Sequence, residues 1–274
     1  MLFRRISKHV KEQNWFAVAL DFIIVVFGVF IGIQLGNWNE ERADHARSQQ
    51  YLERIASDLT QEISIYNDRV QFWQQVSEYG LAALDEARTG DTSLSSWELL
   101  IAYFQASQTA EFFPSNATFE ELQSAGDLEL VRNADLRSAL SEYYAYPGVG
   151  HLRERPRYRE HIRSILPVRI QKYIWLNCYG TDGALQILKA CPSPITQTDA
   201  EAIVDRLKIN QTLQGELRYW ISSLEVAGLI VLANVQLAKE LRDELYLQID
   251  SHVEKKTNRY KKYYPLTFHG FFMV

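Results

Sequence analysis

An apolar run of 22 residues, from Trp15 to Gly36, constrains this chain more than any other feature of its sequence. As an α-helix the run would be about 33 Å long at ~1.5 Å per residue, which matches the ~30 Å hydrocarbon core of a bilayer. Trp15 and Trp38 bracket it at the depths where indole rings prefer the membrane interface. No second uninterrupted run of about 18 apolar residues follows, which argues against a transporter with several spans. The sequence therefore predicts one transmembrane helix over residues 15–38.

The charges on either side of the run predict its orientation. Four basic residues precede it, Arg4, Arg5, Lys8 and Lys11. The charged residues that follow it begin with Glu40 and Glu41, with only Arg42 and Arg47 as nearby bases. Positively charged flanks stay on the cytoplasmic side of a membrane. We therefore expect residues 1–14 to be a cytoplasmic basic N-terminus at the inner (plasma) membrane, and the C-terminal domain to be periplasmic or extracellular.

A cleaved signal peptide is the alternative interpretation of the same start. The apolar run is longer than the usual signal core of ~7–15 residues, and no Ala-x-Ala cleavage site follows it. The sequence around Asn37 and Glu40 is also a poor cleavage context. These features favour an uncleaved anchor.

Glycine spacing within the run predicts a close contact between helices. Gly28, Gly32 and Gly36 form a GxxxGxxxG series, which places three glycines on one helix face where another backbone can approach. Asp21 lies on the same side, and an ionisable group in a span is costly unless it is paired or hydrated. We expect a second copy of the chain or a helical membrane partner here. The alternative is that glycine is merely common in membrane helices and that water reaches Asp21 from the cytoplasmic edge.

Composition predicts a packed, acidic body outside the span. The 274 residues are 47% hydrophobic with 13 Gly and 7 Pro, which excludes a collagen-like or disordered chain. The net charge of -5 is the sum of regions with opposite charges. Residues 37–253 hold 20 Lys and Arg against 31 Asp and Glu, whereas residues 254–274 form a basic aromatic tail. We expect this tail to contact either anionic lipid headgroups or the body.

Apolar periodicity predicts an all-α fold, in which the N-terminal transmembrane helix continues into a long-helix bundle or coiled ectodomain over residues 39–253. Residues 39–88 lack proline and have a break near Gly80. Their inward face repeats at helical spacing, through Leu52, Ile55, Leu59, Ile63, Tyr66, Val70, Trp73, Ser77, Leu81 and Leu84. Residues 211–253 repeat the pattern, with either Ile230 or Val231 on the inward face. Short helices lie between them, with starts predicted at Ser95, Thr118, Asn133, Pro156 and Thr198. Residues 177–197 form the clearest loop.

The only two cysteines, Cys178 and Cys191, lie in that loop. An even number of cysteines in a segment expected outside the cytoplasm predicts a disulfide. Free structural thiols are the alternative.

Five arginines in a short basic segment, residues 151–163, are candidates for contact with an anion: Arg153, Arg155, Arg157, Arg159 and Arg163. Guanidinium groups bind phosphate or carboxylate through two parallel hydrogen bonds, so an anionic lipid, glycan or peptide fits them. The alternative is a solvated face that pairs with the acidic surplus of the body. Nucleic acid is not expected as a partner, because the body is acidic and is expected to lie outside the cytoplasm.

Catalytic, cofactor-binding and metal-binding motifs are not recognisable. The six histidines are scattered without HExxH spacing, and no GxSxG, SxxK, P-loop or GxGxxG sequence occurs. Acidic pairs such as Glu120 and Glu121 lie at predicted helix starts, where the helix dipole favours them. The sequence therefore assigns no catalytic residue, cofactor or metal.

Two sequence blocks resemble an uncharacterised family of bacterial single-pass membrane-anchored proteins. The first ends the span as Ile-Gly-Ile-Gln-Leu-Gly-Asn-Trp-Asn-Glu (31–40) and continues through Tyr51, Leu52 and Leu59. The second is Glu-Leu-Gln-Ser-Ala-Gly-Asp-Leu-Glu-Leu-Val-Arg-Asn (121–133), followed by Leu136-Arg137 and Tyr143-Tyr144. The resemblance covers roughly residues 1–60 and 116–146. It implies single-pass membrane attachment and supplies no substrate, cofactor or catalytic residue.

Two function classes fit these features. The first is a non-enzymatic binding or scaffold module of the bacterial cell envelope, anchored in the membrane and able to form oligomers. The second is a membrane-tethered enzyme or ligand sensor subunit, whose site forms only in the folded ectodomain. An open cleft with converging carboxylates or histidines would favour the second class.

Overall fold

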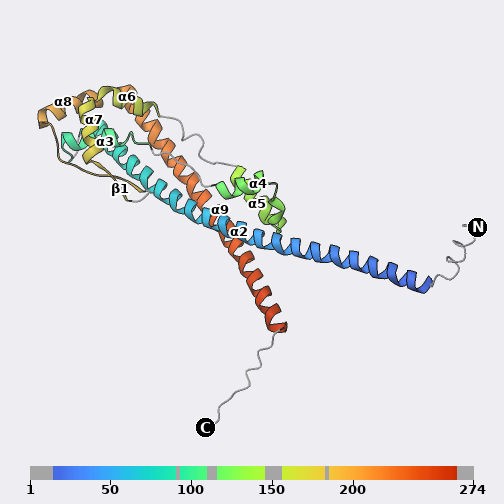
Figure 1. Cartoon of the computed structure of the whole chain (residues 1–274). Helices are drawn as coiled ribbons and strands as arrows, with labels where there is room; N and C mark the ends of the chain where they lie inside the picture. Colours follow the sequence, from blue (N-terminus) through green and yellow to red (C-terminus); the bar gives the residue numbers. More distant parts are fainter. Residues whose placement is uncertain (1–14, 91–92, 110–115, 146–155, 183–184, 264–274) are drawn as a thin grey trace, which may run out of the picture. The chain divides into compact units, whose positions relative to one another are not determined.

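The computed structural model describes residues 15–90, 93–109, 116–145, 156–182 and 185–263 (Figure 1). The chain divides into two units, residues 1–51 and residues 52–274, which are treated separately below. The elements in chain order are α2 (Trp15–Thr89), α3 (Ser96–Gln105), α4 (Ala117–Ser124), the 3-10 turn η1 (Leu128–Leu130), α5 (Ala134–Ala145), α6 (Arg157–Ile165), α7 (Val168–Asn177), β1 (Tyr179–Asp182), β2 (Leu185–Leu188), α8 (Gln197–Lys208) and α9 (Gln211–Tyr263). The predicted all-α class is confirmed.

The described part of the first unit, residues 15–51, is entirely helical and forms the start of α2. Its large apolar side chains are exposed, from Phe22 at 68% to Trp38 at 60%. Such a surface is unfavourable in water but suits contact with lipid. The predicted span is therefore a helix, and it is continuous with the first long helix of the body.

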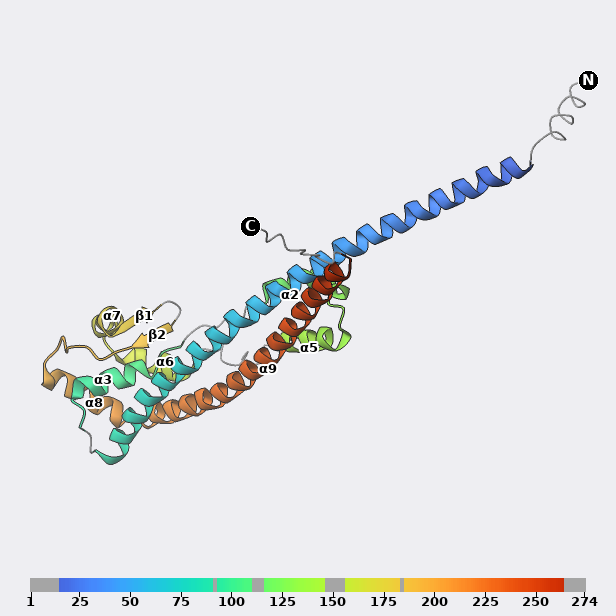
Figure 2. The same cartoon turned by 90° about the horizontal axis from the view of Figure 1, so that it is seen from below.

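The second unit is built on α9 and on the part of α2 from Leu52 onward. These helices lie side by side and run in opposite directions (Figures 1 and 2). At Gly80 side chains of α9 pack directly against the backbone of α2, because a Cβ there would lie 2.9 Å from Cγ1 of Ile221 and 3.3 Å from Cδ1 of Leu217. The predicted break near Gly80 was wrong. This glycine allows the helices to approach each other and does not end α2.

The buried face of α2 shifts around the helix beyond Ser77. The predicted stripe of Leu52, Ile55, Leu59, Ile63, Tyr66, Val70 and Trp73 is buried. After Ser77 the buried positions are Gly80, Ala83 and Glu86, and Leu81, predicted to be in the core, is 52% exposed. A straight helix that crosses its partner at an angle presents a different side along its length.

Helix α3 is the central core helix of the second unit, with eight of its ten residues buried. The predicted capping box is present, since Ser95 Oγ accepts from the Glu98 amide and the Glu98 carboxylate accepts from the Ser95 amide. Tyr103 joins several elements: its hydroxyl donates to Ala83 O at 3.3 Å, and its carbonyl accepts from Tyr158 at 2.7 Å. Buried polar atoms are thereby satisfied across α2, α3 and α6.

Three of the predicted helix starts match the structure, and two do not. Asn133 caps α5, and its Oδ1 accepts from the Asp135 amide at 2.9 Å. Helix α4 begins at Ala117, so Thr118 lies inside it. Helix α8 is capped by Thr196, whose hydroxyl accepts from the Asp199 amide at 3.2 Å, and not by Thr198. At each start a second residue of a type that caps helices, Asn116 or Thr196, lies two positions earlier, and local sequence could not choose between the two.

The predicted loop at residues 177–197 contains an antiparallel hairpin, which is a correction. Strands β1 and β2 pair in the register Tyr179 with Leu188 and Asp182 with Leu185. The side chain of Gln75 on α2 acts as a further strand edge: its Oε1 accepts from the Leu188 amide at 2.9 Å, and its Nε2 donates to Gln186 O at 3.4 Å. Because this support comes from a residue far away in the chain, strands this short gave no signal in the sequence.

Helix α9 ends at Tyr263 and not at the predicted Val253. The beginning of the predicted tail is therefore helical. Residues 264–274 lie outside the described residues, and so do residues 1–14.

Candidate functional site

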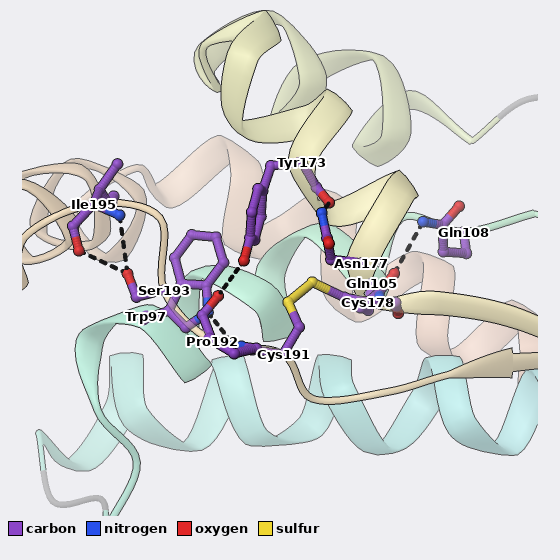
Figure 3. Close-up of a disulfide and its surroundings, with 10 residues drawn as sticks. All are labelled: Trp97, Gln105, Gln108, Tyr173, Asn177, Cys178, Cys191, Pro192, Ser193 and Ile195. Atoms are coloured by element: carbon purple, nitrogen blue, oxygen red, sulfur yellow. Dashed lines mark hydrogen bonds between the residues drawn. A yellow bond between two sulfur atoms is a disulfide. The ribbon is translucent and has the colours of Figure 1, made fainter.

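The disulfide between Cys178 and Cys191 joins the end of α7 to the segment after β2 (Figure 3). Helix α3 binds the backbone of both half-cystines: Trp97 Nε1 donates to Cys191 O at 2.9 Å, and Gln105 Nε2 donates to Cys178 O at 2.8 Å. Tyr173 on α7 donates to Pro192 O at 3.0 Å. Side chains of α3 and α7 thus hold the backbone on both sides of the disulfide.

The candidate arginines divide into three groups. Arg153 and Arg155 lie outside the described residues, and Arg157 is exposed at the start of α6. Arg159 and Arg163 point to the end of α3, where Arg159 Nη1 donates to Ser107 O at 2.6 Å and Arg163 Nη2 donates to Gln108 Oε1 at 3.1 Å. The sequence left open the alternative that these arginines form a solvated face paired with acidic residues. This alternative does not hold for Arg163, because no described carboxylate lies within 4.0 Å of it.

A second site was not predicted from the sequence. Glu62 and Tyr66 on α2 meet Tyr143 and Tyr144 on α5, and we call these four residues the carboxyl–tyrosine cluster. Glu62 is only 1% exposed. Its Oε2 and the hydroxyls of Tyr143 and Tyr144 are buried without a completed hydrogen bond. Tyr144 stacks on Phe119 of α4 at 4.7 Å between ring centres, which closes the cluster from that side.

Burial raises the pKa of the Glu62 carboxyl to about 7. The phenol groups of Tyr66 and Tyr143, which face the carboxyl, lower this pKa, and the negative charge of Asp58 raises it, but the loss of solvent has the largest effect. The pKa values of all three tyrosines are raised, mainly by burial, so the phenols stay protonated. The cluster therefore gains or loses a single proton near neutral pH.

Contacts next to the cluster hold α4 on α2. Arg54 binds Glu121 through two hydrogen bonds, at 2.5 and 3.2 Å, and the Asp58 carboxylate accepts from the Thr118 amide at 3.3 Å. Residues from the two sequence blocks of the family resemblance thus lie together in the second unit. One signal for the cluster was present in the sequence: Glu62 occupies the apolar stripe of α2, three residues after Leu59 and four before Tyr66.

Other chemistry is limited in the described part of the chain. No group of three or more His, Cys, Asp or Glu among these residues could hold a metal ion. A shallow groove of about 300 Å³ lies between α7 and residues 194–195, with Arg169 and Lys172 in its lining. It holds no converging carboxylates or histidines.

Two described helices are long and apolar enough to cross a membrane. One is α2 from Phe22, whose apolar window is 0% buried, and the other is α9 between Gln211 and Asp250, whose window is 33% buried. Helix α9 was not predicted to be a span, and it packs on α5 and α6 as a helix of the body. In the first unit, no described atom other than the helix's own nearby backbone lies within 4 Å of the position of a Cβ at Gly28, Gly32 or Gly36. The side chain of Asp21 is not among the described ones.

Comparison with known proteins gives a match for one segment of the chain. No curated protein and no solved structure matches the chain. A family model matches residues 21–150, which include the apolar start of α2 and the whole carboxyl–tyrosine cluster. The expected resemblance to an uncharacterised family is thus confirmed, and residues 21–150 are similar to the family of unknown function DUF6090.

Proposed function

We propose that this protein is a non-enzymatic binding module, anchored by a single span in the plasma membrane of a bacterial cell envelope. The observation that carries the proposal is the exposed apolar surface of α2 between Phe22 and Leu35, which no other part of the described chain covers. A helix of this length and composition is stable in lipid, because all its backbone groups are satisfied within the helix.

Two further features support a body outside the cytoplasm. The basic residues lie before the span, and acidic residues follow it. The disulfide between Cys178 and Cys191 is also typical of an oxidising compartment.

The alternative function is a membrane-tethered enzyme or ligand sensor subunit. The carboxyl–tyrosine cluster favours it, because a carboxyl with a pKa near 7 is typical of functional sites. However, a catalytic carboxyl must be within reach of a substrate, and Glu62 is buried under α5. A binding function therefore fits the described surface better.

Membrane extraction and protease access test the anchor and its orientation. We expect the full chain to stay in the membrane during an alkaline carbonate wash. External protease should digest the body in spheroplasts but not in intact inverted vesicles, and Cys178 and Cys191 should react with maleimide only after reduction. Release by carbonate, or a mature N-terminus downstream of Gly36, would contradict the proposal.

The glycine face predicts self-association in the membrane. Gly32→Leu should lower the yield of crosslinked dimer in cells several-fold, because the larger side chain keeps two helix backbones apart. Phe30→Trp is the matched control, since it adds bulk about 160° around the same helix from Gly32. Equal dimer yields in the wild type and the Gly32→Leu variant, measured by crosslinking and mass spectrometry, would exclude this face as the contact.

A further inference from the structure

Helix α9 carries apolar residues on two opposite sides. Its inner side packs in the body through Leu217, Leu224 and Val231, which are at most 2% exposed. Val226 and Leu229 lie on the other side of the helix, at ~100° per residue, and Leu229 is 70% exposed. A helix on the surface of a body normally has one apolar face, and a helix that is apolar all round is buried. The outer side of α9 is therefore apolar without being covered by the described part of the chain.

The exposed residues of this outer side follow a heptad pattern. Steps of three and four residues join Tyr219, Ser222, Val226, Leu229 and Ala233, which are all exposed and which we call the outer stripe. Such steps keep positions on one line along a helix, with a drift of only about 20° per heptad. Glu240 takes the next equivalent position and ends the apolar part of the line. Single exposed leucines are ordinary, whereas a continuous apolar line marks a contact surface.

The charges around the outer stripe suit contact with a second copy of the same helix. No charged residue occurs between Glu225 and Lys239, so residues near a two-fold axis would not meet a like charge. Lys239 and Glu244 occupy a g and the following e position of the heptad, which form ion pairs between parallel helices. Neither forms an ion pair with a described residue of its own chain. Leu232 and Leu237, each about half exposed, occupy the g and e positions one heptad earlier and provide an apolar pair.

We propose that α9 of one copy packs in parallel along α9 of a second copy of the chain, through the outer stripe. Two copies anchored in one membrane are related by a two-fold axis along the membrane normal, so both helices run in the same sense along it. The outer stripe is about 21 Å long, which is short for a coiled coil in solution. The anchors compensate, because they hold the two copies at a high effective concentration. The inference rests on the proposed membrane anchor and names the partner of the binding module.

Oxidative crosslinking in membranes from cells that produce the full chain tests the contact. Cys178 and Cys191 are joined to each other, so an introduced cysteine is the single free thiol. We expect Leu229→Cys to give a covalent dimer on a non-reducing gel after treatment with copper phenanthroline. Ile209→Cys is the matched control, because Ile209 is also an exposed apolar residue of the second unit but lies outside the outer stripe. Its dimer yield should be several-fold lower.

A charge exchange tests whether the partner is a second copy in parallel orientation. Lys239→Glu places two acids opposite each other on both sides of the contact, and should lower the Leu229→Cys dimer yield at least about threefold. The double variant Lys239→Glu with Glu244→Lys restores opposite charges and should recover the yield. A lipid or a different protein would not follow this exchange, because it does not carry the other half of the pair. Circular dichroism of the purified variants checks that each is folded.

The other outcomes overturn the proposal. Equal dimer yields from Leu229→Cys and Ile209→Cys indicate random collision, and a double variant that does not recover the yield rejects the parallel pairing. If Leu229→Cys gives no dimer and its thiol reacts with a water-soluble maleimide only after detergent is added, lipid or a different protein covers the face. If the thiol reacts at once, the face is uncovered. All these results leave the carbonate wash and the effect of Gly32→Leu unaffected, so failure of the α9 contact is distinguishable from failure of the membrane anchor.

Discussion

Replacing Glu62 by Gln should stabilise the protein at pH 8 and leave its stability unchanged at pH 4. The side chain is 1% exposed, and its pKa is raised from the ordinary value of 4.5 to about 7. Glutamine has nearly the same shape and never ionises. The expected gain above pH 7 is about 3 kcal/mol in the free energy of unfolding, from ~1.4 kcal/mol per pKa unit.

The sign follows from proton binding in the two states. Below pH 4.5 Glu62 is protonated in both the folded and the unfolded chain, so it adds no pH dependence. Between pH 4.5 and about pH 7 the unfolded chain loses the proton while the folded chain keeps it, and wild-type stability falls as pH rises. Above pH 7 both states are ionised and the full loss is present.

The measurement is the difference in free energy of unfolding between variant and wild type at a series of pH values, by denaturant titration in mild detergent. Glu53→Gln is the matched control, because Glu53 is exposed on the same helix, and its difference should stay near zero throughout. A Glu62→Gln difference that does not change with pH would mean that Tyr66 and Tyr143 keep the buried carboxylate ionised.

Lys208→Met should destabilise the second unit by about 3–5 kcal/mol, the cost of leaving a buried charge without its partner. Lys208 Nζ binds Glu86 Oε1 at 2.5 Å and joins α8 to α2. Glu86 is 5% exposed, and its Oε2 has no other hydrogen bond. Removing the ammonium therefore leaves the carboxylate with no compensating group. Thermal or denaturant unfolding measures the loss.

Two further variants separate the ion pair from other effects at this helix end. Arg206→Met removes an exposed charge from the same last turn of α8 and should cost less than about 1 kcal/mol. The double variant Lys208→Met with Glu86→Gln should recover most of the stability, since no charge is then buried. If the double variant is as unstable as Lys208→Met, packing of the lysine side chain is responsible instead.

The sequence predicted the helical elements well because their signals are local. Apolar residues at three- and four-residue steps predicted the core faces of both long helices, and of the two candidates Ile230 and Val231 it is Val231 that is buried. The predictions that were wrong concern places where residues far apart in the sequence contact each other. Gly80 indicated a break in the helix, but it leaves room for the side chain of Ile221. The strands after Cys178 are supported by the side chain of Gln75.

The candidate sites also combine features that the sequence predicts with contacts that it does not. Arg163 could be chosen from the sequence as a basic residue, but its position between Phe104 and Trp175 could not, because these three residues come from different helices. Glu62 was missed because an acid on an apolar stripe is usually solvated. Its burial depends on Tyr143 and Tyr144, which lie some eighty residues later.

By itself, the sequence determined that the chain is helical and that its first helix has a long apolar start, and it limited any disulfide to Cys178 and Cys191. These properties depend on composition and on spacing within one turn or one segment, where near neighbours dominate the free energy. Only the tertiary structure decided which polar groups are buried together. The pKa of Glu62 and the unpaired charge of Arg163 result from helices that meet across long sequence separations, and desolvation at such contacts depends on their geometry.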